Sequence, residues 1–270
     1  MSLVDPILEC ESLVKTYKGP WSKGKRRNVD ALHDVSLQVR AGATLGIVGE
    51  SGSGKSTLGR LLINLETPTS GSVRFRGREL RGGGRREALE MRKQLQIVFQ
   101  DPYESLNPRL RVGDALTEAL EIQTRMTRRE RRAKALDFLA RVGLSAEDFA
   151  KFPHQFSGGQ RQRVCIARAL IVDPALVVCD EAVSALDVSI QASILELLGE
   201  LQRDLGLTYV FISHDLGVIK NIADDVVVMQ SGRVVERGTV NQIFASPQTD
   251  YTRELLDAAP IVDPHSTRYR

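Results

Sequence analysis

The residues with the clearest capacity for chemistry form one glycine-rich loop, Gly49-Glu50-Ser51-Gly52-Ser53-Gly54-Lys55-Ser56-Thr57. An apolar run precedes this loop and leucines at helical spacing follow it, so the expected order is strand, loop, helix. In such a loop, backbone N–H groups surround a polyphosphate, the lysine reaches its terminal phosphates and the next serine meets Mg²⁺. Glycine lets the backbone approach the anion. The alternative, a flexible glycine-serine linker, does not explain the flanking elements.

Two acidic residues and one histidine end later apolar runs. Asp180 and Glu181 follow residues 176–179, and His214 follows 211–213. Ligands gather at the carboxyl ends of the strands in a parallel α/β sheet, so these side chains should face the phosphates. We expect Asp180 to hold Mg²⁺ and Glu181 to deprotonate an attacking water. Solvated carboxylates at a strand end and a structural histidine are the alternatives.

A second candidate anion site opens a later helix with Ser157, Gly158, Gly159 and Gln160. A hydroxyl and two glycines at a helix N-terminus can bind an anion, but they are also typical of an ordinary capped helix. The segment lies far along the chain from the glycine-rich loop. A single chain would have difficulty in bringing both onto one phosphate.

The elements that must position these residues read as strands alternating with helices, which predicts a parallel sheet covered on both faces. Strands are expected at 3–17, 31–39, 44–48, 72–77, 95–99, 175–179, 208–212 and 226–229. Helices are expected after residue 54 and at 112–120, 128–142, 190–205 and 217–222. Residues 18–27 and 81–86 read as loops, and the strand pattern disappears between about 101 and 172, which predicts an inserted helical lobe.

The composition favours a globular protein. The chain has 270 residues and a formal net charge of +3, from 37 basic and 34 acidic residues, which is too balanced to argue for a nucleic-acid partner. Its three cysteines are widely separated, so neither a disulfide framework nor a zinc site is indicated, and a reducing cytoplasm fits. No signal peptide or membrane span is recognisable, so a role at a membrane would require another chain to cross it.

Two local clusters of basic residues stand out from this balanced composition. One lies within residues 23–27. The other comprises Arg125, Arg128, Arg129, Arg131, Arg132 and Lys134. Each is either a solvated surface or a surface held near anionic lipid headgroups.

Taken together, the motifs resemble the full set of an ABC-transporter nucleotide-binding subunit. The matching motifs are 49–57, Gln100, 157–160, 180–181, Ser184-Ala185-Leu186-Asp187 and His214. The resemblance covers about residues 7–240 and implies an α/β fold: a RecA-like P-loop ATPase core with a mainly parallel sheet, an N-terminal antiparallel β region and an inserted helical subdomain. It places the core at 1–100 and 173–240, the helical subdomain at 101–172 and a C-terminal segment at 241–270.

The resemblance implies that ATP and Mg²⁺ bind to these motifs. Tyr17 would stack on the adenine and Lys55 would bind the β and γ phosphates. The remaining residues of the phosphate loop would be Gly49, Ser51, Gly52, Ser53, Gly54 and Thr57.

The metal and the reaction are assigned by the same resemblance. Ser56 and Gln100 would coordinate Mg²⁺, with Asp180 behind them. Glu181 would act as general base, and His214 would hold the γ-phosphate and the attacking water.

Subunits of this family pair head to tail. The resemblance therefore implies that Ser157, Gly158, Gly159 and Gln160 of one chain close on ATP held by the other, while Asp187 links the two sites. The implied partners are a second identical or homologous ATPase subunit, two transmembrane permease subunits and, indirectly, an external solute-binding protein. The chain would lie on the cytoplasmic face of the inner membrane as a peripheral subunit.

Three segments, at 100–109, 180–189 and 251–256, narrow the resemblance to the importers of di- and oligopeptides, a branch that includes nickel systems. Asp250 stands where that branch usually has proline, and the cysteine-bearing extension of many members is missing. The resemblance thus implies no iron–sulfur cluster, and it supports import more strongly than it supports peptide as the cargo.

The main alternative is a soluble ABC ATPase that acts on DNA or ribosomes. DNA-repair members insert long coiled coils, whereas fewer than sixty residues separate Gln100 from Ser157 here and they contain no heptads. Translation members carry two cassettes and this chain carries one. A small-molecule P-loop kinase would have no need of residues 157–160. The importer reading is therefore preferred.

Overall fold

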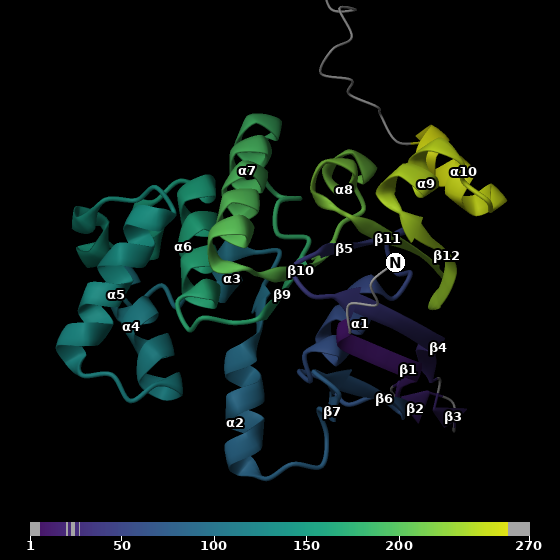
Figure 1. Ribbon diagram of the computed structural model, residues 1–270, viewed down its shortest axis with the longest axis horizontal. Helices are drawn as coiled ribbons and strands as arrows, with labels where there is room; N and C mark the ends of the chain where they lie inside the picture. The colour runs from purple at the N-terminus through teal and green to yellow at the C-terminus, as the bar shows by residue number, and fades with distance from the viewer. Residues whose placement is uncertain (1–5, 20, 23–24, 27, 259–270) are drawn as a thin grey trace, which may run out of the picture.

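The computed structural model describes residues 6–19, 21–22, 25–26 and 28–258. Two sheets and α1 occupy the right-hand part of Figure 1, and a group of helices lies on the left. The central sheet has the order β12-β11-β5-β10-β9-β8. Its strands are β5 (Thr44–Val48), β8 (Leu95–Val98), β9 (Leu176–Asp180), β10 (Thr208–Ile212), β11 (Asp225–Gln230) and β12 (Arg233–Thr239). All neighbours pair in parallel except β11 and β12.

A second, antiparallel sheet has the order β4-β1-β6-β7. Its strands are β1 (Pro6–Tyr17), β4 (Val29–Arg40), β6 (Ser70–Phe75) and β7 (Arg78–Glu79). This confirms the expected antiparallel region near the N-terminus. A short hairpin, β2 (Trp21–Ser22) and β3 (Lys25–Arg26), lies where only a loop was expected.

The helices differ in their surroundings. α1 (Lys55–Leu62), α8 (Leu216–Ile222) and α9 (Val240–Ala245) contact strands of the two sheets. α7 (Val188–Leu205) packs into the core cluster that covers one face of the central sheet, and α10 (Asp250–Ala258) lies beside α9 (Figure 1). The group on the left comprises α3 (Pro102–Ser105), α4 (Val112–Gln123), α5 (Arg128–Arg141), the 3₁₀ helices η1 (Ala146–Ala150) and η2 (Pro153–Gln155), and α6 (Gly158–Leu170). None of the helices within the described ranges is long and apolar enough to cross a membrane.

Alternation along the central strands divides the core into two layers. In β9, Leu176 and Val178 pack into a cluster with β1, β4 and α1, whereas Val177 and Cys179 pack into a cluster with α6, α7 and α8. Successive side chains of a strand point to opposite faces, so an uninterrupted apolar run needs cover on both sides. The predicted doubly covered parallel sheet is confirmed.

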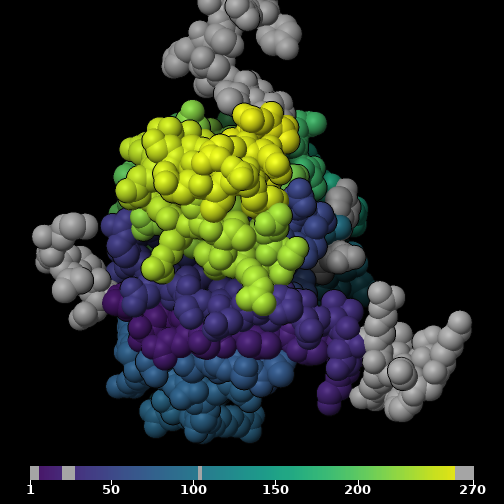
Figure 2. All heavy atoms as spheres, turned by 90° about the vertical axis from the view of Figure 1, so that its right-hand side faces the viewer, coloured from purple at the N-terminus to yellow at the C-terminus, as the bar shows by residue number. Residues whose placement is uncertain are grey.

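A second loop expectation was also wrong, and several elements near the C-terminus were not predicted. Residues 81–86 are not loop throughout, because α2 (Arg85–Gln94) begins at Arg85. This helix consists of good helix formers but has no fully buried residue, and only Met91 packs against a core cluster, so its apolar pattern is weak. The C-terminal α9 and α10 and the antiparallel β12 were not expected either. Figure 2 shows that these C-terminal elements, in yellow and yellow-green, form one layer above the purple strands.

Candidate active site

The glycine-rich loop connects β5 to α1, and its glycines are required by geometry at both ends. Gly49 and Gly54 have φ values of 150° and 99°. A Cβ on Gly49 would lie 2.1 Å from the carbonyl oxygen of Met229, and one on Gly54 would lie 2.6 Å from that of Ala31. No other residue fits these positions, so the loop keeps its backbone open to a ligand.

Lys55 begins α1 and is almost completely buried, at 4% exposure. Its Nζ donates hydrogen bonds of 2.8 Å to the carbonyls of Gly49 and Glu50. Burial lowers the pKa of Lys55, while the carboxylates of Glu181 and Asp180 act in the opposite direction. An ammonium group has three donors, so the two carbonyls orient the third for an anion.

Ser56 and Asp180 meet at the carboxyl end of β9. The Ser56 hydroxyl donates a 2.7 Å hydrogen bond to Oδ1 of Asp180. Burial raises the pKa of Asp180, and the hydrogen bond from Ser56 opposes that effect. Gln100 lines the same cleft of about 430 Å³ as Ser56 and Asp180. The structure thus brings together the three predicted metal-binding side chains.

These three side chains fit a magnesium ion chemically, because a hydroxyl, an amide and a carboxylate all present oxygen. Within the described ranges no group of three or more His, Cys, Asp and Glu residues could hold a metal. Three protein side chains do not complete the coordination of Mg²⁺, so further oxygen ligands would come from phosphate and water.

Glu181 and His214 lie next to this cleft on adjacent strand ends. Nδ1 of His214 is 3.3 Å from Oε2 of Glu181. Glu181 has a φ of 50°, which is uncommon for a residue with a side chain, and its N–H donates to the carbonyl of Ile212. Strained backbone of this kind clusters at functional sites.

Tyr17, at the end of β1, reaches α1. Its hydroxyl donates a 2.6 Å hydrogen bond to Glu66 and lies 3.4 Å from Oγ1 of Thr57. Nζ of Lys15 is 4.8 Å from the centre of its ring. The aromatic residue predicted to contact adenine therefore lies beside the end of the phosphate loop.

The segment that opens α6 is not brought to the glycine-rich loop. Ser157 caps α6 by accepting from the N–H of Gln160, whose side chain accepts from the N–H of Ser157. α6 packs against β8, α3, α4, α5 and α7, whereas α1 packs against β1, β4, β9 and β10. In Figure 1 the two helices belong to different parts of the molecule. Ser157 and Gln160 are exposed to solvent.

Asp187 lies close to that segment. It precedes the first residue of α7, Val188, whose relative exposure of 76% is unusual for a large apolar residue. A Cβ on Gly159 would come within 2.6 Å of Ile190 in the same helix. The exposed start of α7 and the exposed start of α6 therefore form one continuous surface.

The basic cluster at 125–134 is partly neutralised. Arg131 pairs with Glu121, Lys134 pairs with Asp173, and Arg132 lies over the ring of Phe149. The cluster within 23–27 includes residues outside the described ranges.

Several residues near the site were missed by sequence reasoning. Arg60 and Arg168 line the cleft that contains Ser56, and Tyr251 contacts the loop at Glu50. Arg60 lies one helical turn after Ser56, a spacing that could have identified it. Nothing in the local sequence connects Tyr251 or Arg168 with the loop.

Comparison with known families and proteins agrees with this geometry. A family model described as "ABC transporter" matches residues 32–184. The dipeptide transport ATP-binding protein DppF of Haemophilus influenzae is 52% identical over 98% of this chain and 81% of its own length. DppF of Escherichia coli is 50% identical over 100% of this chain and 81% of its own length. The oligopeptide transport ATP-binding protein OppF of Bacillus subtilis is 44% identical over 99% of this chain and 87% of its own length.

Two solved structures have similar folds. One is the ATP-binding cassette MJ0796, as a dimer in a post-hydrolysis state bound to ADP and Pi; its TM-score is 0.76 at 30% identity, over 86% of this chain and 98% of that one. The other is cbiO1 of Clostridium perfringens, part of the ABC transporter complex cbiONQ. Its TM-score is 0.75 at 30% identity, over 90% of this chain and 92% of that one.

Proposed function

This chain belongs to the ABC transporter family, and we propose that it powers the import of a small solute, with di- or oligopeptides as the cargo, through a membrane permease. It is an ATPase of that family. The observation that best supports ATP hydrolysis as the driving reaction is that five side chains meet at one edge of the central sheet: Lys55, Ser56, Asp180, Glu181 and His214. The peptide cargo is supported by the names of the DppF and OppF relatives.

ATP binds, in this proposal, with its phosphates in the glycine-rich loop and its adenine against Tyr17. The phosphates take the remaining donor of Lys55 and the backbone N–H groups of the loop and of the start of α1. Ser56 and Gln100, with Asp180 behind them, would hold Mg²⁺, which when bound neutralises charge on the phosphates.

Hydrolysis uses the carboxylate of Glu181. A water oxygen bonds to the γ-phosphorus as the bond to ADP breaks, and Glu181 accepts the proton that the water loses. His214 hydrogen-bonds to the γ-phosphate and the water from its position beside Glu181. Because His214 lies beside Glu181, it keeps the Glu181 carboxylate directed at the reacting water.

We infer that a complete site needs two chains. The segment 157–160 lies apart from the loop of its own chain and is exposed, so a second subunit can present it to the bound ATP. Asp187 and Val188 lie on the same surface and would meet that subunit. ATP therefore makes more contacts in the closed pair of subunits than in the open pair, which favours the closed state. Hydrolysis removes these contacts and lets the pair open.

The remaining partners follow from the transport role. We propose that residues 101–172 act as the helical subdomain and, together with the segment after Gln100, dock on two permease subunits at the cytoplasmic face of the inner membrane. An external solute-binding protein would act indirectly, through the permease. Residues 1–100 and 173–240 would form the ATPase core, and 241–270 a C-terminal segment.

The shared site is tested by Ser157→Arg. An arginine there should block the second subunit while leaving the loop intact, so the variant should bind ATP normally and lose hydrolysis. Ser70→Arg, also on the surface, is the matched control and should retain both activities. Loss of ATP binding in Ser157→Arg would contradict the shared-site arrangement.

The transport role is tested by purification from detergent-extracted membranes. The full chain should co-purify with two membrane permeases, and peptides presented by the solute-binding protein should stimulate its ATPase activity. Repeated recovery with ribosomes or DNA would instead support the alternative function.

A further inference from the structure

The C-terminal segment reaches the glycine-rich loop through one side chain. The hydroxyl of Tyr251, in α10, accepts a 3.2 Å hydrogen bond from the N–H of Glu50. The same hydroxyl donates to the carbonyl of Met229 at 3.5 Å, at the end of β11. Glu50 is the second residue of the loop, so α10 contacts the loop directly.

The peptide group between Gly49 and Glu50 joins Tyr251 to Lys55. Its N–H donates to Tyr251, and its carbonyl accepts a 2.8 Å hydrogen bond from Nζ of Lys55. A peptide group is planar, so fixing its N–H also fixes the direction of its oxygen. Hydrogen bonds at both ends polarise the group and strengthen one another. The Tyr251 hydroxyl is therefore linked, through a single peptide group, to one of the two carbonyls that hold the Lys55 ammonium.

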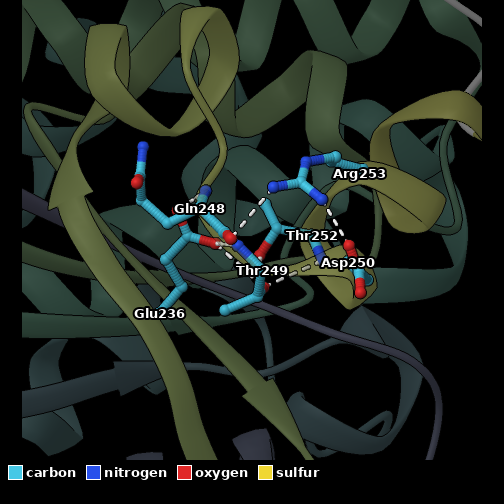
Figure 3. Close-up of polar contacts among 6 residues, drawn as sticks. All are labelled: Glu236, Gln248, Thr249, Asp250, Thr252 and Arg253. Atoms are coloured by element: carbon cyan, nitrogen blue, oxygen red, sulfur yellow. Dashed lines mark hydrogen bonds and ion pairs between the residues drawn. The ribbon is translucent and has the colours of Figure 1, made fainter.

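A buried carboxylate holds the residues that precede Tyr251. Glu236 in β12, only 9% exposed, accepts hydrogen bonds from the N–H groups of Gln248 and Thr249 and from the hydroxyl of Thr249 (Figure 3). The hydroxyls of Thr249 and Thr252 are 2.7 Å apart, and Arg253 donates to the carbonyl of Gln248. Burial raises the pKa of Glu236, but these hydrogen bonds outweigh burial and lower it. Gln248 and Thr249 are thus fastened to β12 just before Tyr251, and the contacts of Thr252 and Arg253 tie the start of α10 to these two residues.

We propose that Tyr251 is a positioning residue for ATP, which holds Lys55 in place through the Gly49–Glu50 peptide, and that residues 248–258 act as a strap that sets the affinity for ATP. The inference deepens the proposed function and rests on its nucleotide site. Coupling between two sites is reciprocal, so ATP should in turn stabilise the strap.

The central experiment is Tyr251→Phe in the full chain. The ring of Tyr251 packs against the larger core cluster, and phenylalanine keeps that packing while it removes only the hydroxyl. The N–H of Glu50 then loses its protein partner. We expect the Kd for a non-hydrolysable ATP analogue to rise about three- to tenfold, the effect of losing one hydrogen bond. The kcat at saturating ATP should change by less than about twofold, because the catalytic carboxylate is untouched.

Tyr209→Phe is the matched control. Its hydroxyl donates to the carbonyl of Leu198, and Tyr209 pairs with Thr44 at the end of the sheet opposite the loop. This variant also loses one tyrosine hydrogen bond, so it should lose stability without a change in the Kd for the analogue.

A second variant tests the strap. Glu236→Gln replaces the carboxylate by a weaker acceptor and should raise the Kd in the same direction. If the strap acts through the Tyr251 hydroxyl, Glu236→Gln should add little to Tyr251→Phe in the double variant. Amide hydrogen exchange across 248–258 should slow when the analogue binds the natural chain, and less so in Tyr251→Phe.

Lys55→Ala separates failure of this inference from failure of the proposed site. If Lys55→Ala binds the analogue as the natural chain does, the proposed nucleotide site is wrong. If Lys55→Ala loses binding but Tyr251→Phe binds normally, only the inference about Tyr251 is overturned. Equal rises in Kd for Tyr251→Phe and Tyr209→Phe would also overturn it, because the effect would then be a general loss of stability.

Discussion

Nδ1 of His214 lies 3.3 Å from Oε2 of Glu181, although the two residues follow different strands. The register of β9 and β10 explains this contact, because Asp180 pairs with Ile212 and the N–H of Glu181 donates to the Ile212 carbonyl. Both side chains therefore leave the sheet at the same edge. The contact between His214 and Glu181 therefore follows from the pairing of the strands and does not require a bound ligand.

Glu181→Gln should bind ATP and lose most of its turnover. The amide keeps the shape of the side chain but cannot accept the proton of the attacking water, so kcat should fall roughly a hundredfold or more. Phosphate release under saturating ATP measures this effect. The exposed Glu200→Gln in α7 is the matched control, and near-normal hydrolysis by Glu181→Gln would rule out its role as general base.

Gly159→Ala should lower stability through a clash between α6 and α7. The added Cβ would be 2.6 Å from Cγ2 of Ile190, whereas a Cβ on Gly158 would be at an ordinary 3.6 Å from Leu186. We expect a loss of about 1–2 kcal/mol in the free energy of unfolding for Gly159→Ala and little change for Gly158→Ala. Denaturant unfolding measures both.

A double-mutant cycle identifies the cause of that loss. In an Ile190→Ala background, which lacks Cγ2, Gly159→Ala should cost clearly less than in the natural chain. An equal cost in both backgrounds would show that the clash is not responsible.

Asp148→Asn should make stability less dependent on pH. Burial raises the pKa of Asp148, but hydrogen bonds from Lys151 and Ser145 outweigh burial and hold it below its usual range. A depressed folded-state pKa stabilises the protein above the unfolded pKa, and this contribution is lost as the pH falls through the folded pKa. The natural chain should therefore exceed Asp148→Asn by about 1–2 kcal/mol in unfolding free energy at pH 7, and the difference should shrink below about pH 5.

The control for that measurement is Asp137→Asn. Asp137 is 57% exposed and pairs with Arg141 on the surface of α5. Its replacement should cost no more than about 0.5 kcal/mol. A difference for Asp148→Asn that stays the same from pH 7 down to about pH 2.5 would contradict the electrostatic explanation.

The three cysteines should be inert in the folded protein. Cys10, Cys165 and Cys179 are all buried, and burial raises the pKa of each thiol to about 12. At pH 8 only about one thiol in ten thousand is then the reactive thiolate. Iodoacetamide should label none of them in the native chain and all three after unfolding. A cysteine introduced at the exposed Ser246 should react rapidly, and fast labelling of any native cysteine would disprove the prediction.

Sequence patterns predicted those parts of the fold that depend on residues close together in the chain. The glycine-rich loop, the buried strands 44–48 and 208–212 and the capped start of α6 depend on backbone dihedrals, apolar periodicity and hydrogen bonds within one turn. The sequence order of β9 and β10 also placed Asp180, Glu181 and His214 at one edge, because parallel strands share their carboxyl ends. α2 escaped prediction because charged and polar residues dominate its sequence, which leaves only a weak apolar pattern in which Met91 reaches the core.

The sequence by itself determined which residues could bind phosphate and which could accept a proton, because those capacities belong to residue types and their local spacing. Tertiary structure alone decided what holds them in place. The hydrogen bond between Glu50 and Tyr251 joins residues 201 positions apart, and that between Ser56 and Asp180 joins residues 124 apart. Neither partner carries a local signal of the other, since such contacts arise only when the strands pair and the helices pack against them.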